Sequence, residues 1–329
     1  MKVAELKNKL QAYKREHLES IIVGMYKAIP RSVKETAEID SLISDPGARH
    51  VRPRVRTLRD IDDIAWETDE FISDAYNQYY FAPNSVVPKS KRPGWRFTAR
   101  RLFKELNQAA DSPDNAPKAA DLLKKLYEML CYSCDYILFS GSDSFDSVGI
   151  RQVDFFQLLL AVKRRIEPVR EFVRDSILLA LANSLNRTTL REDLLEVIVA
   201  FLDTVDLKEM AIEICDQLRK EAAANRLKHL HPFSEGPNSR GARNFVNHLA
   251  IMGWMCHMAL DQPDDANRYY WQHQKEASPE IALYVLLRML RHRQCWNLWL
   301  RAYQEAVARG IQPREELQRQ SGEIREKTG

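Results

Sequence analysis

Residues 264–310 read DDANRYYWQHQKEASPEIALYVLLRMLRHRQCWNLWLRAYQEAVARG, and this stretch contains three consecutive helical patterns. In the second and third patterns the apolar residues recur three and four positions apart, which places them on one face of an α-helix. The predicted faces are Ile281, Tyr284, Val285, Leu287 and Leu290 on the second helix, and Trp296, Trp299, Leu300, Tyr303 and Val307 on the third. Each helix therefore needs an apolar neighbour to cover it.

The residues between these patterns are typical of helix ends. Ser278 is a capping residue, Pro279 fits the first turn because its missing N–H would have no partner there, and Glu280 favours the positive end of a helix. Gly310 suits the position just after a helix, and Pro313 follows it. Connections this short make consecutive helices antiparallel, and stacked antiparallel pairs are the unit of an α-solenoid.

The composition of the whole protein favours the same architecture. Its 329 residues are 45% hydrophobic and 29% charged, and 11 of them are glycine. Sustained alternation of apolar and polar residues, which is the pattern of a half-buried strand, is scarce. We therefore predict an all-α fold of antiparallel helix pairs in an α-solenoid-like array, similar in kind to HEAT and TPR arrays but without a repeat of fixed period.

Charge and cysteine content narrow the class of protein. The formal net charge of +3 is too small to indicate a polyanion partner for the whole protein. No apolar run is long enough to span a bilayer, and the charged opening residues MKVAELKNKLQAYKREHLE contain no signal-peptide core. Cysteines that are scattered and odd in number, five in all, are typical of a reducing compartment. We expect a cytoplasmic protein without a membrane partner.

The sequence pattern divides the protein into two regions. We predict a helical N-terminal region over residues 1–139, with an irregular charged segment at 46–93, and solenoid-like helical repeats over 150–329. The polar sequence SGSDSFDSVG, residues 140–149, is the expected boundary between them. Inside the irregular segment we expect one amphipathic helix reaching to Tyr79 or Tyr80. Its predicted apolar face is Ile61, Ile64, Ala65, Thr68, Phe71, Ile72 and Ala75.

Three short motifs follow one another near the N-terminus: LKNKL at 6–10, EHLESIIVGMYK at 16–27 and VKE at 33–35. This order resembles the opening of a family of bacterial all-helical proteins of unknown function. Members of that family begin with a Leu-Lys-rich helix, continue with a helix ending in Tyr-Lys, and then carry Val-Lys-Glu. The resemblance covers about the first 45 residues. It implies an all-helical fold and supplies no catalytic residues.

The sequence carries no catalytic or cofactor signature. The motifs GxxxxGK[ST], GxGxxG, GxSxG and HExxH are absent. Cys131 and Cys134 form a CxxC pair, but the pair lies in a helical pattern with no second pair near it, so we interpret both as small buried residues. A metal site assembled from residues distant in sequence is the alternative. We expect no enzyme activity, no metal and no cofactor.

One charge pattern rises above the background. Residues 48–59 contain five arginines and no acid, residues 60–74 contain seven acids and no Lys or Arg, and residues 89–104 are again basic. The candidate polyanion-binding residues in segments 49–59 and 89–104 are Arg52, Arg54, Arg56, Lys91, Arg92, Arg96, Arg100 and Arg101. Trp95 and Phe97 could stack on bases. The opposing interpretation, which we favour, is that the acids pair with these bases inside the protein.

Two hypotheses about function follow. The first is a non-catalytic helical scaffold or protein-interaction module that binds a protein partner on the inner face of the array, and it depends on architecture together with the missing catalytic signature. The alternative is binding of nucleic acid, or of an acidic partner, through 49–59 and 89–104. We expect most of the C-terminal aromatic residues to lie in the core, with one or two lining a peptide groove.

Overall fold

The structure, a computed structural model, describes residues 3–29, 39–44, 59–141 and 143–328. All regular elements in these residues are helices, so the predicted all-α class is confirmed. The protein divides into two compact units, Met1–Thr57 and Leu58–Gly329. The described helices of the first unit are α1 (Val3–Gln11), α2 (Arg15–Ala28) and α4 (Ile39–Ser44). No residue of α2 is buried.

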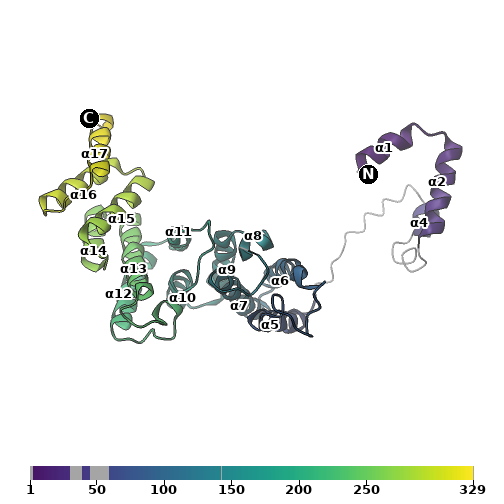
Figure 1. The fold of residues 1–329 in the computed structure, drawn as a ribbon, viewed down its shortest axis with the longest axis horizontal. Helices are drawn as coiled ribbons and strands as arrows, with labels where there is room; N and C mark the ends of the chain where they lie inside the picture. The colour runs from purple at the N-terminus through teal and green to yellow at the C-terminus, as the bar shows by residue number, and fades with distance from the viewer. Residues whose placement is uncertain (1–2, 30–38, 45–58, 142, 329) are drawn as a thin grey trace. The chain divides into compact units, whose positions relative to one another are not determined.

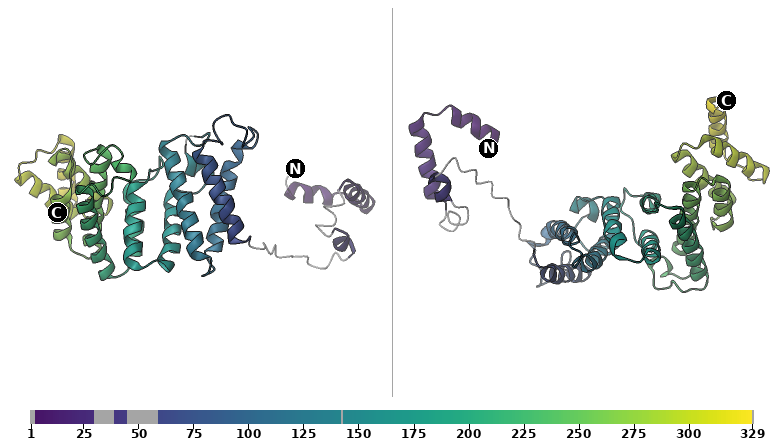
Figure 2. Two further views of the ribbon diagram at one scale, coloured as in Figure 1. Left: turned by 90° about the horizontal axis from the view of Figure 1, so that it is seen from below. Right: turned by 180° about the vertical axis from the view of Figure 1, so that it is seen from behind.

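The other helices that the structure describes belong to the second unit, and Figures 1 and 2 show them in sequence from blue to yellow. In order along the sequence they are α5 (Ile61–Tyr76), η1 (Arg92–Gly94), α6 (Trp95–Ala109), α7 (Ala116–Asp135), α8 (Ser144–Val148), α9 (Gln152–Ile166), α10 (Val169–Ala182), α11 (Arg191–Phe201), α12 (Val205–Ala223), η2 (His231–Phe233), α13 (Arg240–Ala259), α14 (Pro263–His273), α15 (Pro279–His292), α16 (Trp296–Ala308) and α17 (Glu315–Thr328). None of the described helices is both long enough and apolar enough to cross a membrane.

Helices two apart in the sequence lie side by side. Contacts join α5 to α7, α7 to α9, α9 to α11 and α11 to α13, and Figure 2 shows these helices as a row. The first two run in the same direction, because Asp62 and Asp69 of α5 form ion pairs with Lys118 and Lys125 of α7. This arrangement, with intervening helices such as α6 and α10 also in contact with the row, is the solenoid-like array that the sequence predicts.

The predicted helix boundaries hold best where a capping residue marks them. The Ser278 hydroxyl accepts from the backbone N–H of Ile281 at 3.2 Å, and α15 begins at Pro279. Gly310 follows α16 with a φ of +85°, a left-handed conformation that favours glycine. The acidic helix α5 ends at Tyr76, a few residues earlier than predicted, because Gln78 adopts a φ of +59° and turns the backbone.

The predicted faces are right for α5 and shifted for α15 and α16. The buried residues of α5 are Ile64, Ala65, Thr68, Phe71 and Ala75, all of them predicted. Ile281 of α15 and Val307 of α16, however, are 42% and 45% exposed. The buried faces of these two helices include the alanines Ala282, Ala302 and Ala306, which shift each face away from the largest apolar residues. The small side chains let the neighbouring helices approach.

The polar segment 140–149 lies inside the second unit. It contains the short helix α8, whose Phe145 and Val148 belong to the same buried cluster as residues of α7 and α9. The Asp143 carboxylate caps α8 by accepting from the backbone N–H of Asp146 at 3.1 Å. The division of the structure therefore falls between Thr57 and Leu58, and one core continues through the residues that we expected to form a boundary.

Candidate functional site

The basic segments that the sequence singled out fall into two groups. Arg52, Arg54 and Arg56 lie outside the described residues. The second segment, 89–104, is described in full and forms η1 and α6. Its residues Lys91, Arg96 and Arg100 are exposed, whereas Arg92 and Arg101 are half-buried. The structure therefore describes the whole second segment and Arg59 of the first.

The acidic helix α5 pairs with part of this segment. Glu67 accepts from Arg101 of α6 and also from Arg59, whose Nη1 lies 2.7 Å from the Glu67 carboxylate. Glu105 lies 3.1 Å from both arginines. The hydrogen bond from Arg101 lowers the pKa of Glu67, and the hydrogen bond from Arg59 lowers it as well. Arg101 is therefore part of a mixed-charge cluster within the protein, as the opposing interpretation of the charge pattern predicted.

The aromatic residues of the segment differ in availability. Trp95 is 3% exposed and stacks on Phe139 with ring centroids 3.8 Å apart, so the expectation that it could stack on a base is wrong. The short connection through η1 puts Trp95 at the first position of α6, where it turns into the core. Phe97 is 65% exposed, and the guanidinium of Arg96 lies 5.0 Å from the centre of its ring. Arg92 donates to the carbonyl of Val87 at 3.1 Å and so supports the preceding loop.

The CxxC pair is packed into α7. Cys131 is buried and accepts from the Gln152 amide at 3.2 Å, and Cys134 is half-buried. Burial raises the pKa of both thiols, that of Cys134 to about 12, so the nucleophilic thiolate is disfavoured. Among the residues that the structure describes, no three His, Cys, Asp or Glu side chains are grouped so that they could hold a metal ion.

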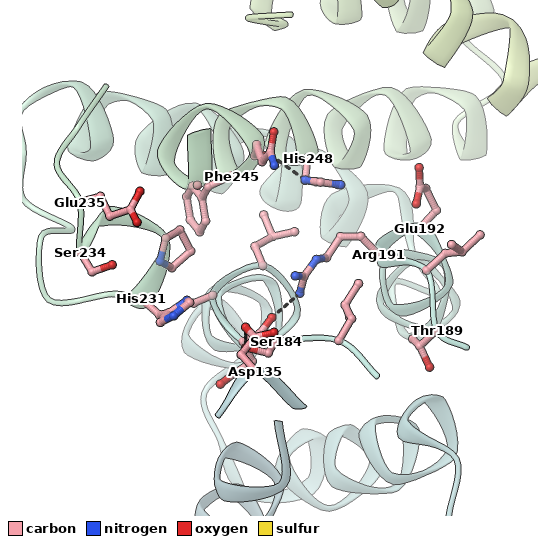
Figure 3. A pocket seen from close by; sticks show the side chains of 18 of the residues that line it. Asp135, Ser184, Thr189, Arg191, Glu192, His231, Ser234, Glu235, Phe245 and His248 are labelled. Atoms are coloured by element: carbon pink, nitrogen blue, oxygen red, sulfur yellow. Dashed lines mark hydrogen bonds between the residues drawn. The ribbon is translucent and has the colours of Figure 1, made fainter. Parts of the chain in front are cut away.

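The second unit contains a cavity of about 810 Å³ where several helices end (Figure 3). Its wall is formed by the end of α7, the end of α10 with the loop after it, the start of α11, η2, α13 and one residue of α15. Apolar side chains line part of it, including the buried Leu181 and Phe245. Polar and charged side chains line the rest, so the cavity can bind a ligand that has both apolar and polar groups.

The loop 184–187, which forms one side of this cavity, is fixed by hydrogen bonds from side chains outside the loop. The fully buried Gln152 at the start of α9 donates to the carbonyl of Ser184 at 2.9 Å and accepts from the backbone N–H of Asn186 at 2.8 Å. The Asp143 carboxylate accepts from the backbone N–H of Arg187 at 3.2 Å. Three hydrogen bonds to buried side chains therefore fix the backbone of 184–187.

Arg191 crosses the cavity from α11 toward the end of α10. Its Nη1 donates to the backbone carbonyls of Ala180 and Asn183, the latter at 2.7 Å. These bonds satisfy carbonyls at the C-terminus of α10, where a cation is also favoured by the helix dipole. Burial lowers the pKa of the Arg191 guanidinium, which means that the surroundings do not fully compensate its charge.

His248 of α13 lies in the same hollow, as Figure 3 shows. Its Nδ1 lies 2.6 Å from the carbonyl oxygen of Asn244. Burial lowers the pKa of His248, and the positive charge of Arg191 lowers it further. Asn244 and Glu192 act in the opposite direction, but the net direction is downward. Glu192 is itself paired with Arg288 of α15.

Among the described lining residues, no hydrogen bond joins a serine hydroxyl to a histidine. The Ser184 hydroxyl donates to the carboxylate of Asp135, and the hydroxyl of Tyr136 lies 3.4 Å from the Nε2 of His231. A serine nucleophile needs a base, usually a histidine, at hydrogen-bond distance from its hydroxyl. The polar and charged side chains of the lining can bind a ligand by charge and hydrogen bonds.

Arg191 and His248 were not among the residues that sequence analysis proposed. One signal for Arg191 was present: the sequence TLREDLL at 189–195 begins a helix with a cation, although the positive end of a helix favours anions. A cation in that position is not favoured by the dipole of its own helix. No local pattern marks His248, because its place beside Arg191 depends on how α11 and α13 pack together.

Comparison with known proteins adds one likeness. No family model matches this sequence, and no curated protein matches it. Among solved structures, the crystal structure of a de novo designed helical repeat protein is similar over 81% of this protein and 100% of its own length, with 15% sequence identity and a TM-score of 0.24. A likeness at this TM-score supports no argument about function. The resemblance of the N-terminal residues to a bacterial family stays a prediction.

Proposed function

We propose that this protein is a non-catalytic helical scaffold that binds a segment of a protein partner in the cavity beside Arg191. The observation that carries the proposal is the cavity itself, which measures about 810 Å³ and lies where helices of the array end. That volume lies within the range of about 300–1,000 Å³ that is typical of ligand pockets. Solenoid arrays use such surfaces between neighbouring helices to bind extended partners.

The lining of the cavity supports a peptide as the ligand. Buried apolar residues such as Leu181 and Phe245 can cover an apolar side chain. Hydroxyl groups, carboxylates and guanidinium groups on the same wall can bind a polar backbone or a charged side chain. The fixed loop at 184–187 keeps this wall in place before binding, which reduces the entropy lost when a partner is bound.

A selection of displayed peptides against the purified full-length protein tests this proposal. Ser184 faces the cavity and Arg187 is exposed on the same loop outside the lining, so Ser184→Trp and Arg187→Trp form a matched pair. We expect wild type and Arg187→Trp to enrich the same peptides, and Ser184→Trp to lose them because its indole blocks part of the cavity. Equal enrichment by Ser184→Trp would place binding elsewhere. No enriched peptide with any of the three proteins would contradict the scaffold function.

The cellular setting that we propose is the cytoplasm. All five cysteines are described and free, with three of them buried. Free thiols in this number fit a reducing compartment, in which disulfides do not persist.

The oligonucleotide alternative rests on the exposed residues Lys91, Arg96 and Arg100 together with Phe97. Its support is smaller, because Arg101 and Arg59 are already paired with Glu67.

A further inference from the structure

We propose that the cavity beside Arg191 binds one carboxylate of the partner segment, held by the guanidinium of Arg191 and by the imidazole of His248. This inference rests on the proposed function and names the chemical group that the cavity recognises. It requires a cation without an acidic partner, free donors on that cation, and a charge balance that suits a single anion.

The first requirement is met by Arg191. Both of its hydrogen bonds run to backbone carbonyls, those of Ala180 and Asn183. Within the described residues no acidic side chain forms an ion pair with it. Of the other charged groups nearby, Glu192 pairs with Arg288 and Asp135 accepts from Ser184, whereas Glu235 is exposed. A half-buried guanidinium thus faces a cavity without a side-chain anion bound to it.

The second requirement concerns the donors that remain. A guanidinium carries five N–H groups in a planar fork: a pair on each Nη and a single one on Nε. The two hydrogen bonds to carbonyls are both made by Nη1 of Arg191. Nη2 and Nε therefore keep N–H groups on the same edge of the fork. That edge has the geometry that binds both oxygens of a carboxylate.

His248 can provide a further donor to the same anion. Because the Asn244 carbonyl only accepts, the Nδ1 of His248 carries the hydrogen of their 2.6 Å contact. Nε2 then has a lone pair in the neutral ring and becomes a donor when the ring is protonated. An anion in the cavity would favour that protonation, because it would offset the positive charge of Arg191 that now lowers the pKa of His248. Binding of a carboxylate is therefore linked to proton uptake.

Several other charged and titratable groups line the same cavity as His248. They are Arg191 and Glu192 on α11, Arg288 on α15, His231 on η2, Glu235 in the loop after it, and Asp135 at the end of α7. Arg288 lowers the pKa of His248 and Glu192 raises it, and these two are paired with each other. The group whose charge can be newly offset by a ligand is therefore Arg191.

The charge balance favours a carboxylate over a phosphate. Glu192, Glu235 and Asp135 all line the cavity. A phosphate group carries nearly two negative charges and would be repelled by these acids, and a nucleic acid would bring many more. A single carboxylate carries one charge, which matches Arg191, the guanidinium in the cavity lining that forms no ion pair among the described residues. The source of that carboxylate is an aspartate or glutamate side chain, or the C-terminus of the partner polypeptide.

The test measures the pKa of His248 and peptide affinity together in the full-length protein. Histidine labelled with carbon-13 is followed by NMR from about pH 5 to about pH 8.5 with each of four probes. The probes are acetyl-hexaglutamate amide, acetyl-hexaglutamine amide, acetyl-hexaglutamine with a free C-terminus, and inorganic phosphate. We expect hexaglutamate or the free C-terminus to raise the pKa of His248 and to bind about tenfold more tightly at pH 6 than at pH 8. The hexaglutamine amide should do neither.

Three variants separate the roles of the residues. Arg191→Gln should weaken hexaglutamate binding by about tenfold or more, because a charge-assisted bidentate contact is lost. His248→Gln should keep most of the affinity at pH 8 and remove its dependence on pH. Arg174→Gln is the control, since Arg174 lies on α10, whose end Arg191 contacts, and pairs with Glu221. Circular dichroism confirms folding of each, because Arg191 also caps α10.

Two results would overturn the inference. Equal binding of hexaglutamate and hexaglutamine amides would show that the carboxylate is not recognised, and phosphate binding more tightly than either carboxylate would name a different anion. Either result leaves the proposed scaffold function intact if the wild-type protein still enriches displayed peptides that Ser184→Trp does not. If no displayed peptide is enriched, the scaffold function itself is contradicted. If Arg191→Gln does not fold, the pH dependence of the His248→Gln variant decides the question.

Discussion

Gly253 of α13 faces the ring of Tyr269 on α14. A Cβ atom at this glycine would lie 2.0 Å from Cε1 of the tyrosine, far inside van der Waals contact. The ring cannot easily move away, because its hydroxyl donates to Asp216 at 2.7 Å and accepts from Arg219 at 2.8 Å. The residue type at one position thus sets how closely two helices of the array approach each other.

We predict that Gly253→Ala destabilises the protein. Alanine gains about 1 kcal/mol in helix propensity, but the overlap with a ring held at both ends costs more. The expected net loss in the free energy of unfolding is about 1–3 kcal/mol, measured by urea denaturation. Gly322→Ala is the matched control, since nothing lies within 4 Å of its Cβ position on α17, and it should stabilise by about 0.5–1 kcal/mol. Equal stability of both variants would contradict the overlap.

At the scale of helices, charge pairs set which segments are available to a partner. Glu67 of α5 accepts hydrogen bonds from Arg59 and from Arg101 of α6. Lys118 and Lys125 of α7 pair with acids on the same helix α5. The acidic helix therefore serves as a shared partner for its basic neighbours, and its acids do not form a wholly free surface.

The stability contributed by Glu67 should depend on pH. Its pKa in the folded protein lies below the ordinary 4.5, chiefly because Arg101 donates a hydrogen bond to it. A carboxyl group with a lower pKa when folded stabilises the fold above about pH 4.5, and this contribution is lost as the pH falls below that value. Glu67→Gln should therefore lose less stability than wild type between about pH 5 and pH 3. Glu70→Gln, exposed on the same helix, should keep the wild-type slope in thermal unfolding.

The basic segments should bind oligonucleotides only weakly. Arg59 and Arg101 are paired to Glu67, which leaves the exposed cations of 89–104, namely Lys89, Lys91, Arg96, Arg100 and Lys104. We expect fluorescence anisotropy to show no binding of single- or double-stranded oligonucleotides at about 200 mM salt, because few phosphates would be neutralised. Any binding at about 50 mM salt should be removed by changing Lys91, Arg96 and Arg100 to Glu. The same changes at Arg52, Arg54 and Arg56 would test whether the first basic segment also contributes to that binding. Tight binding at the higher salt would favour the nucleic-acid alternative.

At the scale of the whole molecule, the protein has two units that differ in their cores. The buried cluster includes residues from Ile64 to Leu317, all of them in the second unit. Its helices contact near neighbours in the row, as in other helical arrays. In such an array the stability is approximately the sum of contributions from adjacent helices.

Residues 58–329 should therefore fold without the first unit. We expect this fragment to unfold at the same temperature as the full-length protein, within a few degrees, because no residue of α2 is buried and the described core lies entirely in the second unit. Differential scanning calorimetry of both proteins gives the comparison. A large fall in the unfolding temperature, or loss of a cooperative transition, would show that residues 1–57 stabilise the second unit.

The sequence by itself determined the helical class, the apolar face of α5 and the ends marked by Ser278 and Gly310. These features are encoded within a few neighbouring residues, because helix periodicity and capping are local. The tertiary structure alone decided that Trp95 is buried, that Glu67 joins two arginines, and that Arg191 and His248 share a cavity. Each of these depends on how distant helices stack, and stacking follows from the shapes of whole faces, small alanines included, which no short stretch of sequence specifies.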